Sequence, residues 1–214
     1  MLKTFLISTA ALVAALAGVA SSAGGAQTIE NPWFPLRPGT TYRYQGTDSG
    51  VREIDLVHVT HKKKTILCKK TTVVHDRVFE HGRVVEDTFD YYWQDRRGAV
   101  WYYGEDTKEL DAHGRVKSRE GTWRAGVDGA EQGIIMPAHP RVGQRYREEF
   151  EKGQAEDYAK IVRIQRNLLT THEWTPLEPG VLDAKYYRRG VGTVREASIK
   201  GGREYISLVR VTRD

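Results

Sequence analysis

The chain has 214 residues, of which 33 are Lys or Arg and 28 are Asp or Glu. This length fits one domain or two small ones. Hydrophobic residues make up 39% of the chain, which is enough for a buried core and excludes wholesale disorder. The single cysteine excludes a disulfide framework and a cysteine-based zinc cluster.

Residues 1–26 have the pattern of a secretory signal peptide. Lys3 gives a short basic start, an apolar run covers 5–19, and small residues cover 20–26. This order predicts cleavage after Ala23 or Ala26 and a secreted or periplasmic location. A membrane anchor is the alternative, but the apolar run is short for a span of ~20 residues and no basic stop follows it. No later stretch is apolar enough to be a transmembrane segment.

From residue 27 onward, period-two stretches bounded by Gly, Asp, Asn or Pro predict β-strands and no long helix. In chain order, the expected strands are 41–45, 51–60, 73–80, 83–94, 99–103, 144–151, 154–164, 168–174, 184–188, 191–197 and 204–211. Strands at this spacing pair antiparallel in sequence order. The sequence therefore predicts one all-β domain over 27–214, folded as an antiparallel up-and-down barrel or a half-open barrel.

Three other segments have their own expectations. The Gly- and Pro-rich segment 123–140 predicts one long loop. The segment 65–74 has the composition of a strand, so its Cys68 is expected to be a buried thiol. The alternatives for this cysteine are a nucleophile and an intermolecular disulfide. The segment 31–38 contains three prolines and cannot pair as a central strand, so we expect it to pack across the sheet as an extended cover, with Trp33 and Phe34 plugging one end of the core.

Three motifs resemble those of an uncharacterised family of exported bacterial proteins. They are Asn31-Pro32-Trp33-Phe34-Pro35-Leu36-Arg37-Pro38-Gly39-Thr40, Glu86-Asp87-Thr88-Phe89-Asp90 and Trp101-Tyr102-Tyr103-Gly104-Glu105-Asp106-Thr107. The resemblance implies an exported β-rich domain and no activity. The ending Tyr186-Tyr187 followed by Gly190-Val191-Gly192 is also similar to bacterial lipoproteins with lipid-carrier-like half-barrels.

The hairpin expected over 144–164 carries the first candidate site. With Lys152-Gly153 as a two-residue turn, Glu149 faces Glu156 and Glu148 faces Asp157. Like charges directly opposite each other are unfavourable across strands. An inward pair must therefore share a proton, bind a cation or meet an arginine. The alternative is an outward, solvated pair.

The strand expected over 83–94 carries the second candidate site. Alternation places Glu86, Asp90 and Tyr92 on one face. This face is either the solvated outside of a sheet or a polar barrel interior that holds a ligand. Trp101 and Tyr103, from the next strand, are expected to supply aromatic walls.

These patterns predict seven ligand-binding residues: Glu86, Asp90, Tyr92, Trp101, Tyr103, Glu149 and Glu156. Three of their carboxylates are also metal candidates, for Ca²⁺ or another divalent cation, namely Asp90, Glu149 and Glu156.

The function that these patterns favour is that of an exported binding protein with an aromatic, carboxylate-lined concavity. Its partner would be a small-molecule or polymer ligand. One alternative is a secreted hydrolase or lyase that uses paired carboxylates as acid and base. A second alternative is a structural envelope protein without a cavity. Nucleic acid is not an expected partner, because basic residues are interspersed with acidic ones and no recognition motif is present.

Overall fold

The computed structural model describes residues 28–214, so the predicted signal peptide lies outside the described residues. The described segment consists of strands, turns and loops; it contains no helix and hence none that could cross a membrane. The strands are β1 (Thr40–Asp48), β2 (Val51–Ile66), β3 (Lys69–Glu80), β4 (Arg83–Gln94), β5 (Val100–Leu110), β6 (Val116–Ser118), β7 (Trp123–Arg124), β8 (Glu131–Met136), β9 (Arg145–Arg147), β10 (Glu149–Phe150), β11 (Tyr158–Gln165), β12 (Leu168–Trp174), β13 (Leu182–Arg188), β14 (Gly192–Lys200) and β15 (Tyr205–Arg213).

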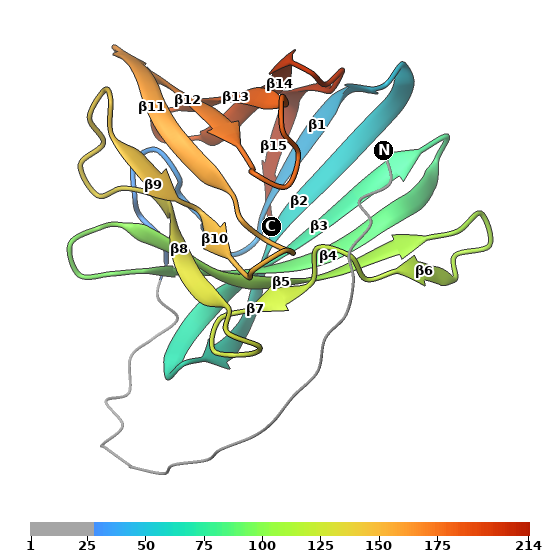
Figure 1. Ribbon diagram of the computed structural model, residues 1–214, viewed down its shortest axis with the longest axis horizontal. Coiled ribbons are helices and arrows are strands. Elements are labelled where there is room, and N and C mark those ends of the chain that lie inside the picture. Colours follow the sequence, from blue (N-terminus) through green and yellow to red (C-terminus); the bar gives the residue numbers. More distant parts are fainter. Residues whose placement is uncertain (1–27) are drawn as a thin grey trace.

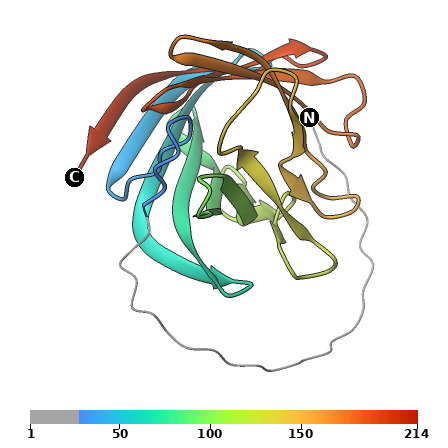
Figure 2. The same ribbon diagram turned by 90° about the vertical axis from the view of Figure 1, so that its left-hand side faces the viewer.

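All the strands belong to one antiparallel sheet. Its order is β10-β8-β5-β4-β3-β2-β1-β15-β14-β13-β12-β11-β9, and β6 and β7 pair with β5 (Figure 1). Two meanders, β1 to β5 and β11 to β15, are joined where β1 pairs with β15. The sheet curls so that the two meanders face each other (Figure 2). The sheet is nearly closed, with one unsealed seam, and the predicted antiparallel barrel is confirmed.

The seam lies along the segment that contains β9 and β10. Arg147 of β9 is opposite Tyr158 of β11, whereas Glu149 of β10 is opposite Gln132 of β8. This short segment thus hydrogen-bonds to both ends of the sheet in turn. A Cβ atom on Gly133 of β8 would lie 2.2 Å from the carbonyl oxygen of Glu148, so only glycine permits this close approach.

The segment 123–140 is not the single long loop that the sequence predicts. It contains β7 and β8, and Met136 of β8 is fully buried opposite Val100 of β5. The apolar run at the end of β8 explains the difference, because it gives this segment a face to bury against the core. Gly126 and Gly129 lie in the turn between β7 and β8, where Gly126 has a φ of 83°.

The prediction of a buried Cys68 is wrong. Strand β2 continues to Ile66 and β3 begins at Lys69, so Cys68 lies in the tight turn between them and is exposed. Leu67 and Cys68 both have positive φ, at 45° and 62°. This conformation is typical of a two-residue hairpin turn of type I′.

The segment before β1 packs against the barrel, as predicted, but it doubles back on itself and is not extended. Ile29 and Leu36 exchange two backbone hydrogen bonds, of 3.3 and 3.0 Å. The side chain of Asn31 donates to the carbonyl oxygens of Gly98 and Pro137. Trp33 is only 4% exposed and belongs to the core. The segment therefore closes one end of the barrel.

Candidate functional site

A cavity of about 970 Å³ lies inside the barrel. Its walls come mainly from the inner faces of β1 to β5 and of β13 to β15, and the segment 34–36 lines one end. Eleven of the chain's 28 acidic residues line the cavity, against two of its 33 Lys and Arg residues, Lys117 and Lys185. The acidic lining residues are Asp48, Glu53, Asp55, Asp76, Glu80, Glu86, Asp90, Glu109, Glu120, Glu196 and Glu204.

The carboxylates are distributed along the length of the cavity. Near the β1–β2 and β3–β4 turns, Glu53 is opposite Glu80. One two-residue step further along the wall, Asp55 lies on β2 and Glu86 is opposite Glu109. Each such step along a strand covers about 7 Å.

The wall continues inward in the same way. Asp76 of β3 is opposite Val57, the next inward residue of β2, and Asp90 is opposite Val74. Beyond Asp90, the ring of Tyr92 meets Phe34 at a centroid distance of 5.3 Å. The cavity thus passes from a carboxylate-rich end to an aromatic end at the plug.

Asp55 and Asp76 form a close carboxyl pair on adjacent strands. The two side chains are hydrogen-bonded to each other, yet the buried Oδ1 atom of each has no hydrogen-bond partner. Burial raises the pKa of Asp55 to about 7. Burial, followed by the charge of Asp55, raises the pKa of Asp76 well above its ordinary value. These shifts favour one proton shared between the two groups.

Asp90 is buried deeper, at 8% exposure. Its Oδ1 atom accepts a hydrogen bond of 2.6 Å from the hydroxyl of Tyr102, whose ring stacks on Tyr92 at 4.8 Å. Burial, and next the charge of Asp76, raise the pKa of Asp90 to about 7, against the opposing effect of the Tyr102 hydrogen bond.

Lys185 places an ammonium group among carboxylates on the opposite wall. Its Nζ atom lies 3.0 Å from Oε2 of Glu173 and 3.7 Å from Oε2 of Glu196. Burial opposes the charged form, but the two carboxylates together raise the pKa of Lys185 well above its ordinary value. Glu173 also accepts hydrogen bonds from Thr171 and Tyr187, at 2.6 and 3.3 Å. Lys185 is therefore a charged counter-ion built into the interior.

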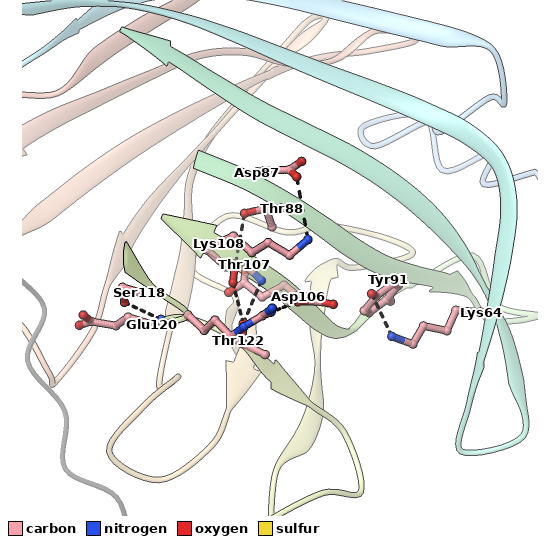
Figure 3. A network of polar contacts seen from close by, with 12 residues as sticks. Lys64, Asp87, Thr88, Tyr91, Asp106, Thr107, Lys108, Ser118, Glu120 and Thr122 are labelled. Atoms are coloured by element: carbon pink, nitrogen blue, oxygen red, sulfur yellow. Dashed lines mark hydrogen bonds and ion pairs between the residues drawn. The ribbon is translucent and has the colours of Figure 1, made fainter. Parts of the chain in front are cut away.

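The two faces of β4 and β5 differ in chemistry, as Figure 3 shows. Thr88 and Thr107 are buried and hydrogen-bonded to each other at 3.1 Å, on the face that also carries Glu86 and Asp90. Asp106 alternates with these residues and forms an ion pair of 3.2 Å with Arg119. Asp87 and Asp106 of the outer face thus have basic partners, Lys108 and Arg119, whereas the residues that line the cavity include eleven acidic side chains and two lysines.

The structure brings together three of the seven predicted ligand-binding residues. Glu86, Asp90 and Tyr92 all line the cavity. Trp101 and Tyr103 are not among the lining residues, because Tyr102 between them faces inward opposite Tyr92. Alternation therefore places both on the outer face, where Trp101 is opposite Trp93 and Tyr103 packs edge-on against Trp93 at 6.3 Å.

The remaining two residues, Glu149 and Glu156, do not form the predicted cross-strand pair. The predicted register holds where Arg147 is opposite Tyr158, and the backbone N–H of Glu148 still donates to the carbonyl oxygen of Asp157 at 2.7 Å. Glu149 then pairs with β8, and Glu156 accepts a hydrogen bond of 2.7 Å from the backbone N–H of Gly153. The reason is the seam, because the chain turns to pair with β8 after Glu148.

Glu148, which lies where β9 passes into β10, is the buried carboxyl of this hairpin. It is 4% exposed, and its Oε1 atom has no hydrogen-bond partner. Burial, and next the charge of Glu173, raise the pKa of Glu148 well above its ordinary value.

Sequence reasoning missed Asp55, Asp76 and Lys185. The available signal was the period-two spacing of Glu53 and Asp55, which marks one strand face as acidic. The alternate face of β2 carries Ile54 and Leu56, so apolar periodicity alone assigns the wrong face to the interior. Within residues 28–214, no three or more His, Cys, Asp or Glu side chains are grouped so that they could hold a metal ion.

Comparisons with known proteins give distant likenesses. No protein-family model matches the chain, and no curated protein matches it. A structure from Bacteroides fragilis, of a protein inferred to be exported and described as having a YmcC-like fold, has 13% identity and a TM-score of 0.47. A structure from Parabacteroides distasonis, of a protein inferred to be a lipoprotein, has 12% identity and a TM-score of 0.39. Each likeness covers 85% of this chain and 99% of the other.

Proposed function

We propose that this protein is an exported binding protein that holds a small or extended ligand in the cavity of the barrel. The observation that carries the proposal is the cavity itself. Its volume of about 970 Å³ lies at the upper end of the range of about 300–1,000 Å³ that is usual for small-molecule sites.

The lining indicates what kind of ligand would bind. Carboxylates accept hydrogen bonds, and tyrosine hydroxyls both donate and accept them. Four tyrosines line the cavity alongside the acidic residues: Tyr42, Tyr44, Tyr92 and Tyr187. This combination suits a cationic or hydroxyl-rich guest. A divalent cation bound together with that guest is part of the same proposal.

Native mass spectrometry of the protein isolated from the periplasm or the medium tests the proposal directly. We expect the mature chain, without residues 1–26, to carry an additional non-covalent mass. Calorimetric titration with amines, oligosaccharides and Ca²⁺ would then identify the ligand class. We expect Asp90→Asn to weaken binding by about tenfold, because a charged hydrogen-bond acceptor is lost.

A matched control is Asp106→Asn, which removes a carboxylate from the outer face of β5. This variant should bind as the wild type does. The proposal is wrong if the isolated protein carries no ligand and binds no member of these three classes.

A further inference from the structure

We infer that the ligand is a linear organic polycation, a diamine or triamine in its ammonium form. This inference rests on the proposed function and names the ligand class of the same cavity. Its first support is the segregation of charge: eleven acidic residues and two lysines line the cavity, although the chain as a whole has a net charge of +5. An interior of this sign favours a ligand with several positive charges.

The second support is the spacing of the carboxylates. Glu53 precedes the hydrogen-bonded pair Asp55–Asp76 by one two-residue step of about 7 Å along the wall, and Asp90 lies one such step beyond Asp76. Such a step is comparable to the distance between ammonium groups joined by a short methylene chain. A single Ca²⁺ ion instead needs its oxygen ligands gathered within about 2.6 Å, and the described residues contain no such group.

The third support is the pair of unsatisfied oxygens. The Oδ1 atoms of Asp55 and Asp76 are buried without a hydrogen-bond partner, although both residues line the cavity. Leaving a buried polar atom unpaired is costly. An ammonium group has three donors and no acceptor. It is therefore the group that could satisfy both carboxyls and replace the proton that they share.

The fourth support is Lys185, which is itself an alkyl chain ending in an ammonium group. The barrel interior already binds that group through Glu173 and Glu196. Valine side chains lie between the carboxylates on the facing wall, at Val57, Val74 and Val78. They offer apolar contact to the methylene groups of a linear amine.

Isothermal titration with spermidine at pH 8 and low ionic strength tests this inference. At that pH the carboxyls whose pKa lies near 7 are ionised. We expect one spermidine to bind per chain, butylamine to bind at least about tenfold more weakly, and added salt to weaken the binding of spermidine.

The diagnostic variant is the double substitution Asp55→Asn and Asp76→Asn. It keeps the size of both side chains and should weaken spermidine binding by about tenfold or more. Asp106→Asn is the outer-face control and should leave it unchanged. A second double variant, Glu53→Gln with Glu80→Gln, changes two cavity-lining residues at the carboxylate-rich end. It should also weaken spermidine binding, so that misfolding of one double variant does not obscure the result.

The outcomes separate this inference from the proposed function. Suppose that spermidine fails to bind, whereas a neutral oligosaccharide binds to the wild type and binds more weakly to Asp90→Asn. The inference of a polycationic ligand is then wrong, and the proposed function as a binding protein remains. If spermidine binds equally to wild type and to both double variants, binding occurs outside the cavity and the inference is overturned. If neither amine, oligosaccharide nor Ca²⁺ binds, both proposals fail.

Discussion

The Nζ atom of Lys185 lies 3.0 Å from Oε2 of Glu173, on the inner wall of the barrel. Glu173 is buried, and Glu148 and Glu196 are close enough to act on the charge of the same lysine. The ammonium group thus offsets the repulsion among three carboxyl groups that come from three different parts of the chain.

We expect Lys185→Met to lower the free energy of unfolding by about 3 kcal/mol, because removal of one partner leaves buried carboxylates uncompensated. Urea denaturation followed by tryptophan fluorescence measures the change. Lys117→Met is the matched control, since the side chain of Lys117 is 58% exposed and its Nζ atom lies 3.9 Å from Oε2 of Glu109. A surface pair of this kind contributes less than about 1 kcal/mol. Equal losses in the two variants would contradict the role of Lys185.

The thermal stability of the ligand-free protein should fall as pH rises from 5 to 8. Burial raises the pKa of Glu53, Asp55, Asp90 and Glu196 to about 7, whereas unfolded carboxyls titrate near ~4. The folded state therefore binds more protons between these values, and its stability is full below the unfolded pKa and lost as pH passes the folded pKa.

Differential scanning calorimetry across this pH range measures the effect. We expect the melting temperature to fall by roughly 5–10 °C between pH 5 and pH 8. The double variant Asp55→Asn and Asp76→Asn should show a shallower dependence, because two of the titrating groups are gone. A melting temperature that rises with pH would show that these carboxyls are not buried in the folded protein.

Removing the plug side chain should destabilise the barrel. Trp33 is 4% exposed, so Trp33→Ala deletes a large buried side chain, and we expect a loss of about 3–5 kcal/mol. Deletion of residues 27–38 should lower the melting temperature by several degrees as well. Val142→Ala, at a side chain that is 62% exposed, should change stability by less than about 0.5 kcal/mol. Unchanged stability after the deletion would mean that the segment does not close the barrel.

The seam should open when Gly133 acquires a side chain. In Gly133→Ala the new Cβ atom would lie 2.2 Å from the carbonyl oxygen of Glu148, so β8 and the 145–150 segment must separate. Hydrogen exchange is the measurement, and the amide of Phe150 should exchange faster than in the wild type. Gly82→Asn, in an open turn with positive φ that asparagine tolerates, should leave exchange at the seam unaltered.

The sequence predicted the fold class better than the site. Local turns and period-two strands were sufficient for an antiparallel barrel, and the register of β9 with β11 followed from a single hairpin. For the face of β4 that carries Glu86, Asp90 and Tyr92, the sequence left open a solvated outside or a barrel interior, and this face lines the cavity.

The remaining errors have a common physical cause. Which face of a strand turns inward depends on the neighbouring strands. A bulge within a strand adds one residue and so reverses which side chains face inward beyond it. The ladder between β4 and β5 shifts register between Asp90 and Tyr92, after which Tyr102 faces inward between Trp101 and Tyr103. The strand change at Glu149 depends on β8, which is distant in the sequence and was not expected as a strand.

The pairing of β1 with β15 also has a consequence for biogenesis. Thr40 of β1 lies opposite Arg213 of β15, near the C-terminus. One edge of β1 therefore stays unpaired until β15 has been synthesised. In a chain that is synthesised N-terminus first, the two meanders form before that edge is covered. An unpaired edge is a template for intermolecular strand addition, and contacts between distant parts of a chain form slowly. The interval between synthesis of β1 and synthesis of β15 is therefore the period in which we expect this edge to be most open to strand addition.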